Sequence, residues 1–281
     1  MGRVVCPLRG HTTPRVSAVE ILTTDLGLLY EALLEILSEI YVTSGAVEQA
    51  DYDEDVILFN HEPGLSKGRK QPEFEVCLAG QWCAIEVKTP RLISYRTSCT
   101  QRTVQLNSRL FTEKIREEST KPRDNPVKDF LVSADAKFES YEDYRTGSIR
   151  ILVIVWDDFC NEPITALNSV ASGLLTSRSF FRTSDNKPVT YPHIDAIIII
   201  RHQHQLRLAT KCEPLADGVR DAFNYHHNGF PPKVLIPCHG GREIPQEVMV
   251  ALNAIPLSKQ LGAEYHSQDV VFWMPLDLSQ S

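Results

Sequence analysis

Apolar and polar residues alternate along residues 71–92, QPEFEVCLAGQWCAIEVKTPRL, on both sides of the short segment Ala79-Gly80-Gln81. A period of two is typical of β-strands, and a short glycine-containing break between two such runs predicts a hairpin. Because successive side chains of a strand point to opposite faces, the polar residues of the hairpin share one face. That face carries three acids and one lysine, namely Glu73, Glu75, Glu86 and Lys88.

Two registers of this hairpin are compatible with the sequence. If Ala79-Gly80 forms a two-residue loop, Glu73 lies opposite Glu86. If Gly80-Gln81 forms the loop, as a turn that prefers glycine first would favour, Glu75 lies opposite Glu86 instead. Both registers gather the three acids and the lysine on one face.

Apolar residues at helical spacing predict helices on both sides of the hairpin. The first is expected over residues 25–41, the second over about 100–118, and the third over about 125–145, starting at the cap-and-proline pair Asn125-Pro126. On the first helix we expect one stripe to face the core, formed by Leu26, Leu29, Leu33, Leu37 and Ile40. The opposite, solvent-facing stripe would be Glu31, Glu35 and Glu39.

Three further apolar runs predict strands. Residues 54–60 precede the hairpin, and residues 151–158, ILVIVWDD, form a run short enough to be a strand covered on both faces. Residues 195–209, DAIIIIRHQHQLRLA, begin in the same way and then alternate, which predicts a strand that includes His202 and His204. Together the elements predict an α/β fold with a mixed central sheet flanked by helices and extra C-terminal elements.

Composition narrows the class of protein. A chain of 281 residues with 42% hydrophobic composition can bury a sizeable core, and it contains no apolar run long enough to cross a bilayer and no secretory signal pattern. Its seven cysteines include no CxxC pair, so we expect a reduced, intracellular location, cytoplasmic or nuclear. Glycine patterns typical of nucleotide triphosphatases and dinucleotide-binding folds are absent from the sequence.

Charge is distributed unevenly along the chain. Residues 88–128 hold ten Lys or Arg and four Asp or Glu, a local net charge of +6 in a chain whose formal net charge is −7, which leaves −13 for the remainder. A basic segment that begins at Lys88 is where a phosphate backbone would lie if the nearby acids held a metal ion. The alternative is a helix that presents mixed charge to water.

The negative charges of the hairpin acids need a neighbouring positive charge, because like charges opposite each other in a sheet reduce the stability of the fold by up to about 1 kcal/mol. Hard cations such as Mg²⁺ and Mn²⁺ bind carboxylate oxygens and would supply it. The alternative is a solvated face on which Lys88 balances two of the acids. A zinc site is also conceivable, but none of its donors has structural-zinc spacing: His202, His204, Cys212, His226, His227, Cys238 and His239.

The hairpin motif and the order of elements resemble the PD-(D/E)xK nuclease superfamily, whose members share the restriction-endonuclease-like fold. The matching residues are Pro72-Glu73, followed after twelve residues by Glu86-Val87-Lys88, within the order helix, three strands, helix, strand. The resemblance covers roughly residues 25–200. It departs from the family pattern at Glu73, where an aspartate is usual.

The resemblance implies an αβββαβ core and a set of site residues. Glu73 and Glu86 would bind the metal, with Glu75 as a substitute ligand, and Lys88 would be the catalytic lysine. Members often add an acid on the first helix and a polar residue on the helix after the lysine strand, and the supporting candidates here are Glu35 and Lys137. Nucleic-acid contacts are expected from Arg91, Arg96, Arg102 and Arg109.

The function implied is a Mg²⁺- or Mn²⁺-dependent phosphodiesterase that cleaves nucleic acid, with DNA as the expected substrate and a homodimer as a conceivable assembly. No membrane partner is expected. Residues 1–212 would form the nuclease-like core domain with an N-terminal arm, and residues 213–281 a C-terminal accessory segment packed on that core. The alternative is a nuclease-fold protein without catalytic activity that acts as a binding or assembly module.

Overall fold

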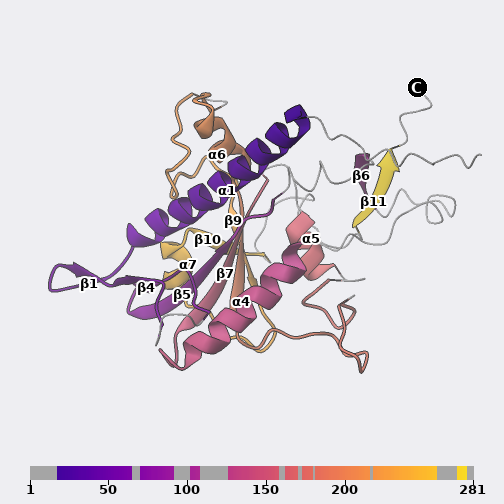
Figure 1. The fold of residues 1–281 in the computed structure, drawn as a ribbon. Coiled ribbons are helices and arrows are strands. Elements are labelled where there is room, and N and C mark those ends of the chain that lie inside the picture. Colours follow the sequence, from indigo (N-terminus) through magenta and orange to yellow (C-terminus); the bar gives the residue numbers. More distant parts are fainter. Residues whose placement is uncertain are drawn as a thin grey trace, which may run out of the picture.

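The computed structural model describes the backbone of residues 18–64, 70–91, 102–107, 126–157, 162–169, 173–179, 181–215, 218–257 and 271–276. Side chains are described in the same ranges except 18–26, 102–107 and 271–276. The centre of the protein is a seven-stranded mixed sheet of order β10-β9-β8-β7-β5-β4-β3 (Figure 1). Its strands are β3 (Phe59–His61), β4 (Phe74–Leu78), β5 (Gln81–Lys88), β7 (Ile149–Trp156), β8 (Ala196–Arg201), β9 (Lys233–Pro237) and β10 (Ala254–Pro256).

Strand directions divide the sheet into two parts. Strands β3, β4 and β5 form an antiparallel meander, and β5, β7 and β8 run parallel to one another. Strand β9 is antiparallel to β8, and β10 is parallel to β9. Two small antiparallel ladders lie outside this sheet: β1 (Tyr52–Asp53) with β2 (Val56–Ile57), and β6 (Arg102–Asn107) with β11 (Val271–Leu276).

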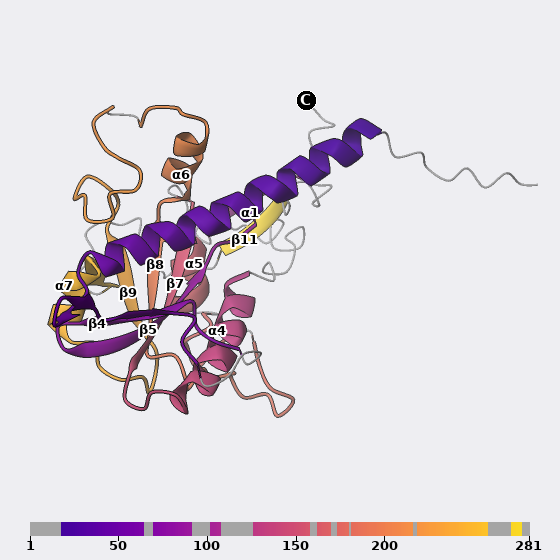
Figure 2. The ribbon, with the colours of Figure 1, turned by 60° about the vertical axis from the view of Figure 1, so that its left-hand side comes forward.

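Helices cover both faces of the sheet (Figures 1 and 2). One face packs against α1 (Ala18–Val47), α6 (Gln203–Thr210) and α7 (Gln246–Ala251). The other packs against α4 (Pro126–Glu142) and α5 (Glu162–Asn168). All eight residues of β7 are buried, because this central strand is covered from both sides. Among the described residues, no helix has the length and apolarity that a membrane span requires.

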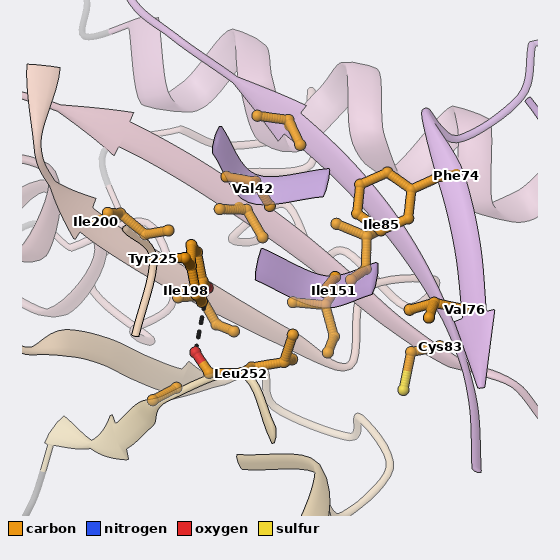
Figure 3. Packing of buried hydrophobic residues seen from close by; sticks show 14 of the residues in the cluster. Val42, Phe74, Val76, Cys83, Ile85, Ile151, Ile198, Ile200, Tyr225 and Leu252 are labelled. Carbon is orange, nitrogen blue, oxygen red and sulfur yellow. Dashed lines mark hydrogen bonds between the residues drawn. The ribbon is translucent and has the colours of Figure 1, made fainter. Parts of the chain in front are cut away.

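The core on the α1 side is built from alternate residues of the strands, shown in Figure 3. Ile85, Ile151 and Ile198 come from three neighbouring strands and pack together in this layer. The hydroxyl of Tyr225 donates a hydrogen bond of 3.1 Å to the carbonyl of Leu252 and so satisfies its polar atom within the apolar cluster. Tyr225 and Leu252, which are far from the hairpin in sequence, therefore complete this core layer.

The predicted α/β class, with a mixed sheet packed against helices, is confirmed. The hairpin is confirmed in its first register, because Phe74 pairs with Ile85 and Val76 with Cys83. The turn has positive φ at Ala79 (51°) and Gly80 (78°), as a two-residue turn of the hairpin type requires.

Two predicted elements are corrected by the structure. Residues 102–107, expected in a helix, form strand β6, whose partner β11 lies more than 160 residues away in sequence. Residues 203–209, expected in a strand, belong to helix α6, because the polar residues after β8 leave the sheet at His202. The C-terminal segment, residues 213–281, contributes β9 and β10 to the central sheet.

The orientation of α1 is also corrected. The expected core stripe is largely exposed, including Leu29, Leu33 and Ile40. The helix instead buries Leu34, Tyr41, Val42 and Ala46 against the sheet. The acids expected in solvent lie toward the protein, with Glu31 buried and Glu35 and Glu39 half-buried.

Candidate active site

The candidate site lies where β5 ends, between the sheet and helix α4. Continuing the hairpin register beyond the pair Phe74 and Ile85 places Glu73, which directly precedes β4, opposite Glu86. Glu86 points to the α4 side of the sheet because its neighbours Ile85 and Val87 point to the α1 side. The structure therefore brings the two predicted metal ligands to adjacent strands on one face.

Lys137 of α4 binds both carboxylates. Its Nζ donates to Oε1 of Glu73 at 3.1 Å and to Oε2 of Glu86 at 2.9 Å, and it lies 2.7 Å from Oε1 of Glu86. The helix can present this side chain because Ala134, Phe138 and Tyr141 of its buried stripe hold it against the sheet. One ammonium group thus neutralises part of the repulsion between two acids on adjacent strands.

Lys88 completes the cluster at the end of β5. Its Nζ lies 2.6 Å from Oε1 of Glu86, and the two side chains point the same way because they are two residues apart on one strand. Glu86 is 0% exposed, whereas Lys88 is 23% exposed. The cluster therefore runs from a buried carboxylate to a lysine in contact with solvent.

Two lysines converge on Oε1 of Glu86. The ammonium nitrogen of Lys88 lies 2.6 Å from this oxygen and that of Lys137 lies 2.7 Å from it. The two positive charges stabilise the buried carboxylate, and a metal ion bound at this oxygen would have to replace at least one of them.

Burial sets the ionisation of this cluster. It raises the pKa of the Glu86 carboxyl, although Lys88 and Lys137 act in the opposite direction. Burial alone would lower the pKa of the Lys137 ammonium, but Glu86 and Glu73 outweigh it, so that the pKa is raised. Lys137 is therefore held in its charged form by the acids it binds.

Glu75, the proposed substitute ligand, is not brought into this cluster. It lies opposite Ala84 and is fully buried. Arg145 binds its two oxygens with two hydrogen bonds of 3.0 Å, and Tyr141 and Asn60 also donate to it. Because its acceptor oxygens are occupied in this way, Glu75 stabilises the packing of α4 on the hairpin and does not serve as a metal ligand.

A cavity of about 370 Å³ lies beside the cluster. Its walls come from the end of β5, the middle of α1 and the first turns of α4, and are formed by Glu35, Glu39, Val87, Lys88, Thr89, Asp129, Phe130 and Ser133. The predicted supporting acid, Glu35, lines this cavity but is bound there by Arg91, whose Nε and Nη2 donate to it at 2.8 and 2.9 Å. Arg91 is thereby held next to the site.

Glu39 was not a candidate from the sequence, yet it is closely coupled to the cluster. Burial raises the pKa of its carboxyl, and the charges of Glu73, Glu35 and Glu86 raise it further, while Lys88 lowers it. Glu39 follows Glu35 by one helical turn, and this spacing was the signal available in the sequence. The cavity-lining residues Thr89, Phe130 and Ser133 had no signal of their own.

The donor set fits a hard divalent cation. Glu73 and Glu86 already share one positive group, the ammonium of Lys137, and carboxylate oxygens are the ligands that such a cation prefers. In the part of the chain that the structure describes, no three His, Cys, Asp or Glu side chains surround a common point. A metal ion bound at this point would have Glu73 and Glu86 as its protein ligands and would replace the ammonium of Lys137.

The remaining predicted residues fall elsewhere. Arg96 and Arg109 lie outside the described residues, and Arg102 is on β6, where side chains are not described. His202 is buried at the start of α6, stacked on Tyr41 at a ring distance of 4.2 Å, and its Nε2 contacts the carbonyl of Ala222 at 2.6 Å. His202 is therefore a residue of the protein core.

Comparison with known proteins adds no relative: no protein-family model, no curated protein and no solved structure matches this chain.

Proposed function

We propose that this chain is a nuclease that hydrolyses phosphodiester bonds in DNA and depends on Mg²⁺ or Mn²⁺. The observation that supports it best is the convergence of Glu73 and Glu86, from adjacent strands, on one ammonium group, with Lys88 beside Glu86. Two carboxylates and a lysine in this arrangement are the group that the resemblance to the PD-(D/E)xK superfamily requires. Of these three residues Lys88 lines the neighbouring cavity, from which a substrate would approach the cluster.

The order of elements is consistent with a restriction-endonuclease-like core. When the strands of the two small ladders, β1, β2 and β6, are set aside, helix α1, strands β3, β4 and β5, helix α4 and strand β7 follow in the order αβββαβ. Three of the strands form an antiparallel meander, and β7 pairs in parallel with the third of them. Glu73 directly precedes the second strand of the meander, and Glu86 and Lys88 lie on the third, where the family motif would put them.

Each residue of the cluster has a role in this proposal. Glu73 and Glu86 would hold the ion, which supplies Lewis-acid polarisation of the phosphate and a bound water of lowered pKa. Lys88 would stabilise negative charge that develops beside Glu86, since its ammonium group is fixed there and still meets solvent. Lys137 would keep the two carboxylates together before the ion binds.

Binding of nucleic acid is supported by charge next to the site. Lys88 and Arg91 stand at the start of a segment, residues 88–128, with a net charge of +6. Arg91 is 53% exposed and is held beside the cavity by Glu35, so its guanidinium group is open to a phosphate in solvent. Positive groups next to a metal site would place the substrate backbone across it.

The alternative is a protein with this fold that binds but does not cleave. One observation favours it: Lys88 and Lys137 already balance Glu73 and Glu86, so the cluster requires no metal ion for neutrality. In that case Lys137 would be a permanent structural substitute for the cation.

Incubation of the protein with supercoiled plasmid and with single-stranded DNA separates the two functions. The nuclease cleaves at least one substrate with Mg²⁺ or Mn²⁺ and is inactive with excess EDTA. Intact DNA in every metal condition, combined with retained DNA binding in a mobility-shift assay, would favour the binding module.

A further inference from the structure

Helix α1 presents an apolar surface to solvent. Between residues 27 and 47, where its side chains are described, every exposed residue is a leucine or an isoleucine. These residues are Leu28, Leu29, Leu33, Ile36 and Ile40, with exposed fractions of 42%, 67%, 41%, 52% and 51%. Monomeric proteins rarely leave a contiguous apolar strip of this kind uncovered, so the surface indicates a binding face.

The exposed residues follow a heptad repeat. Leu29, Leu33, Ile36 and Ile40 are separated by four, three and four residues, which is the spacing of the seam of a two-stranded coiled coil. In the sequence of the same helix this spacing continues at Val19, Leu22 and Leu26 before the seam and, after an interruption at Thr43, at Val47. The 30 residues of α1 span about four heptads, the length at which such a pattern indicates a coiled coil rather than chance.

The sheet does not use this seam. Leu34, Tyr41 and Val42, on the other side of the helix, pack into the core. Figures 1 and 2 show α1 lying across the molecule, with its N-terminal part extending beyond the sheet. A second helix can therefore lie along α1 without displacing any part of the core.

We propose that the seam of α1, formed by Leu29, Leu33, Ile36 and Ile40, binds the same seam of a second copy of this chain. A heptad seam is complementary to another helix with the same repeat, and a two-fold symmetric dimer presents identical surfaces to each other. The positions that flank the seam are Tyr30, Ala32, Leu37 and Glu39, so one charged residue of each copy, which is half-buried, borders the contact. The dimer does not depend on the nuclease function.

The test is the oligomeric state of the full chain, measured by sedimentation velocity over a wide range of protein concentration. The wild type is expected to be a dimer. Changing both Leu33→Lys and Ile36→Lys is expected to weaken the dimer by about a hundredfold or more, since it places charges in the apolar seam. The matched control is Val250→Lys on α7, which is 66% exposed and outside the seam and should leave the dimer unchanged.

A second pair of changes keeps the test informative if the lysine variant is unstable alone. Leu33→Glu with Ile36→Glu should also give monomers, and mixing the two variants should restore a dimer because opposite charges then meet across the seam. A monomeric wild type, a dimer that survives the lysine changes, or a mixture that stays monomeric would overturn the proposal. A monomeric wild type would indicate that another part of the same chain covers the seam.

Discussion

The ammonium nitrogen of Lys137 lies 2.7 Å from Oε1 of Glu86, across the contact between helix α4 and strand β5. The same nitrogen lies 3.1 Å from Oε1 of Glu73, so one side chain joins the two strands of the hairpin to the helix. A cation is therefore already held at the point where the proposed metal ion would bind. This relationship makes Lys137 a competitor of the ion, and the competition can be measured.

Replacing Lys137 should strengthen metal binding. With Lys137→Gln the ion no longer has to displace an ammonium group from Glu73 and Glu86, so affinity for Mn²⁺ should rise by about tenfold, or about 1.4 kcal/mol. The variant without metal should unfold at a lower temperature, because the two carboxylates then repel each other. Isothermal titration with Mn²⁺ and thermal unfolding with and without the ion measure both effects. An unchanged Mn²⁺ affinity would show that Lys137 does not compete with the ion for Glu73 and Glu86.

Glu86→Gln should remove activity while preserving the shape of the side chain. Loss of one of the two ligands should lower the rate of metal-dependent DNA cleavage by about 10² to 10⁴-fold. Glu86→Ala is a poorer test, because it leaves Lys88 and Lys137 without their buried partner and should destabilise the protein by about 3 kcal/mol. Cleavage at the wild-type rate by a folded Glu86→Gln variant would exclude Glu86 from the site.

Glu75 provides the matched control for Glu86, since both are buried glutamates on the same face of the hairpin. Glu75→Ala leaves Arg145 and Tyr141 without their acceptor and should cost about 3 kcal/mol of unfolding free energy. The milder Glu75→Gln should leave Mn²⁺ affinity unchanged in protein that remains folded. Denaturant unfolding and Mn²⁺ titration together distinguish this structural role from that of a ligand, and reduced Mn²⁺ affinity would contradict it.

The hairpin was accessible from the sequence because alternation and the turn are local signals, whereas its register stayed open between two alternatives until the strand pairing of Phe74 with Ile85 decided it. Alternation defined the faces, and the Ala79-Gly80 turn suits the positive φ of a two-residue hairpin loop. The candidate cluster was accessible for the same reason, since Glu86 and Lys88 are two residues apart on one strand. Their link to Lys137 rested on the family resemblance and could not be derived from the spacing of residues.

Long-range pairing explains what the sequence did not reveal. The partner of Glu75 is Arg145, seventy residues away, and strand β6 pairs with a segment near the C-terminus. Helix α1 carries apolar residues on two sides, so periodicity alone could not decide which side meets the sheet. The side that packs against the sheet is the one that carries Tyr41, because the ring of Tyr41 packs against those of His202 and Tyr225.

Buried His202 should make stability depend on pH. Burial lowers the pKa of its imidazole to about 4, with Lys233 and Arg220 adding to the effect, whereas the unfolded chain titrates near 6.5. Because the unfolded state binds the proton more tightly, the stabilisation is complete above about pH 6.5 and is lost as pH falls toward 4, by roughly 3 kcal/mol.

Urea unfolding of the wild type and of His202→Gln between pH 4 and pH 7 isolates this contribution. The wild type should lose more stability than the variant over that range, since glutamine does not titrate. Parallel pH profiles for the two proteins would show that His202 does not titrate as its burial requires.

The most direct measurement of the metal site is a crystal structure of the protein grown with Mn²⁺, using the anomalous signal of the ion. If Glu73 and Glu86 bind the ion, an anomalous peak is expected about 2.2 Å from carboxylate oxygens of both residues, with Lys137 displaced from its present position. A structure in which Lys137 still binds both carboxylates and no anomalous peak lies beside Glu86 would contradict the proposal that Glu73 and Glu86 bind a metal ion.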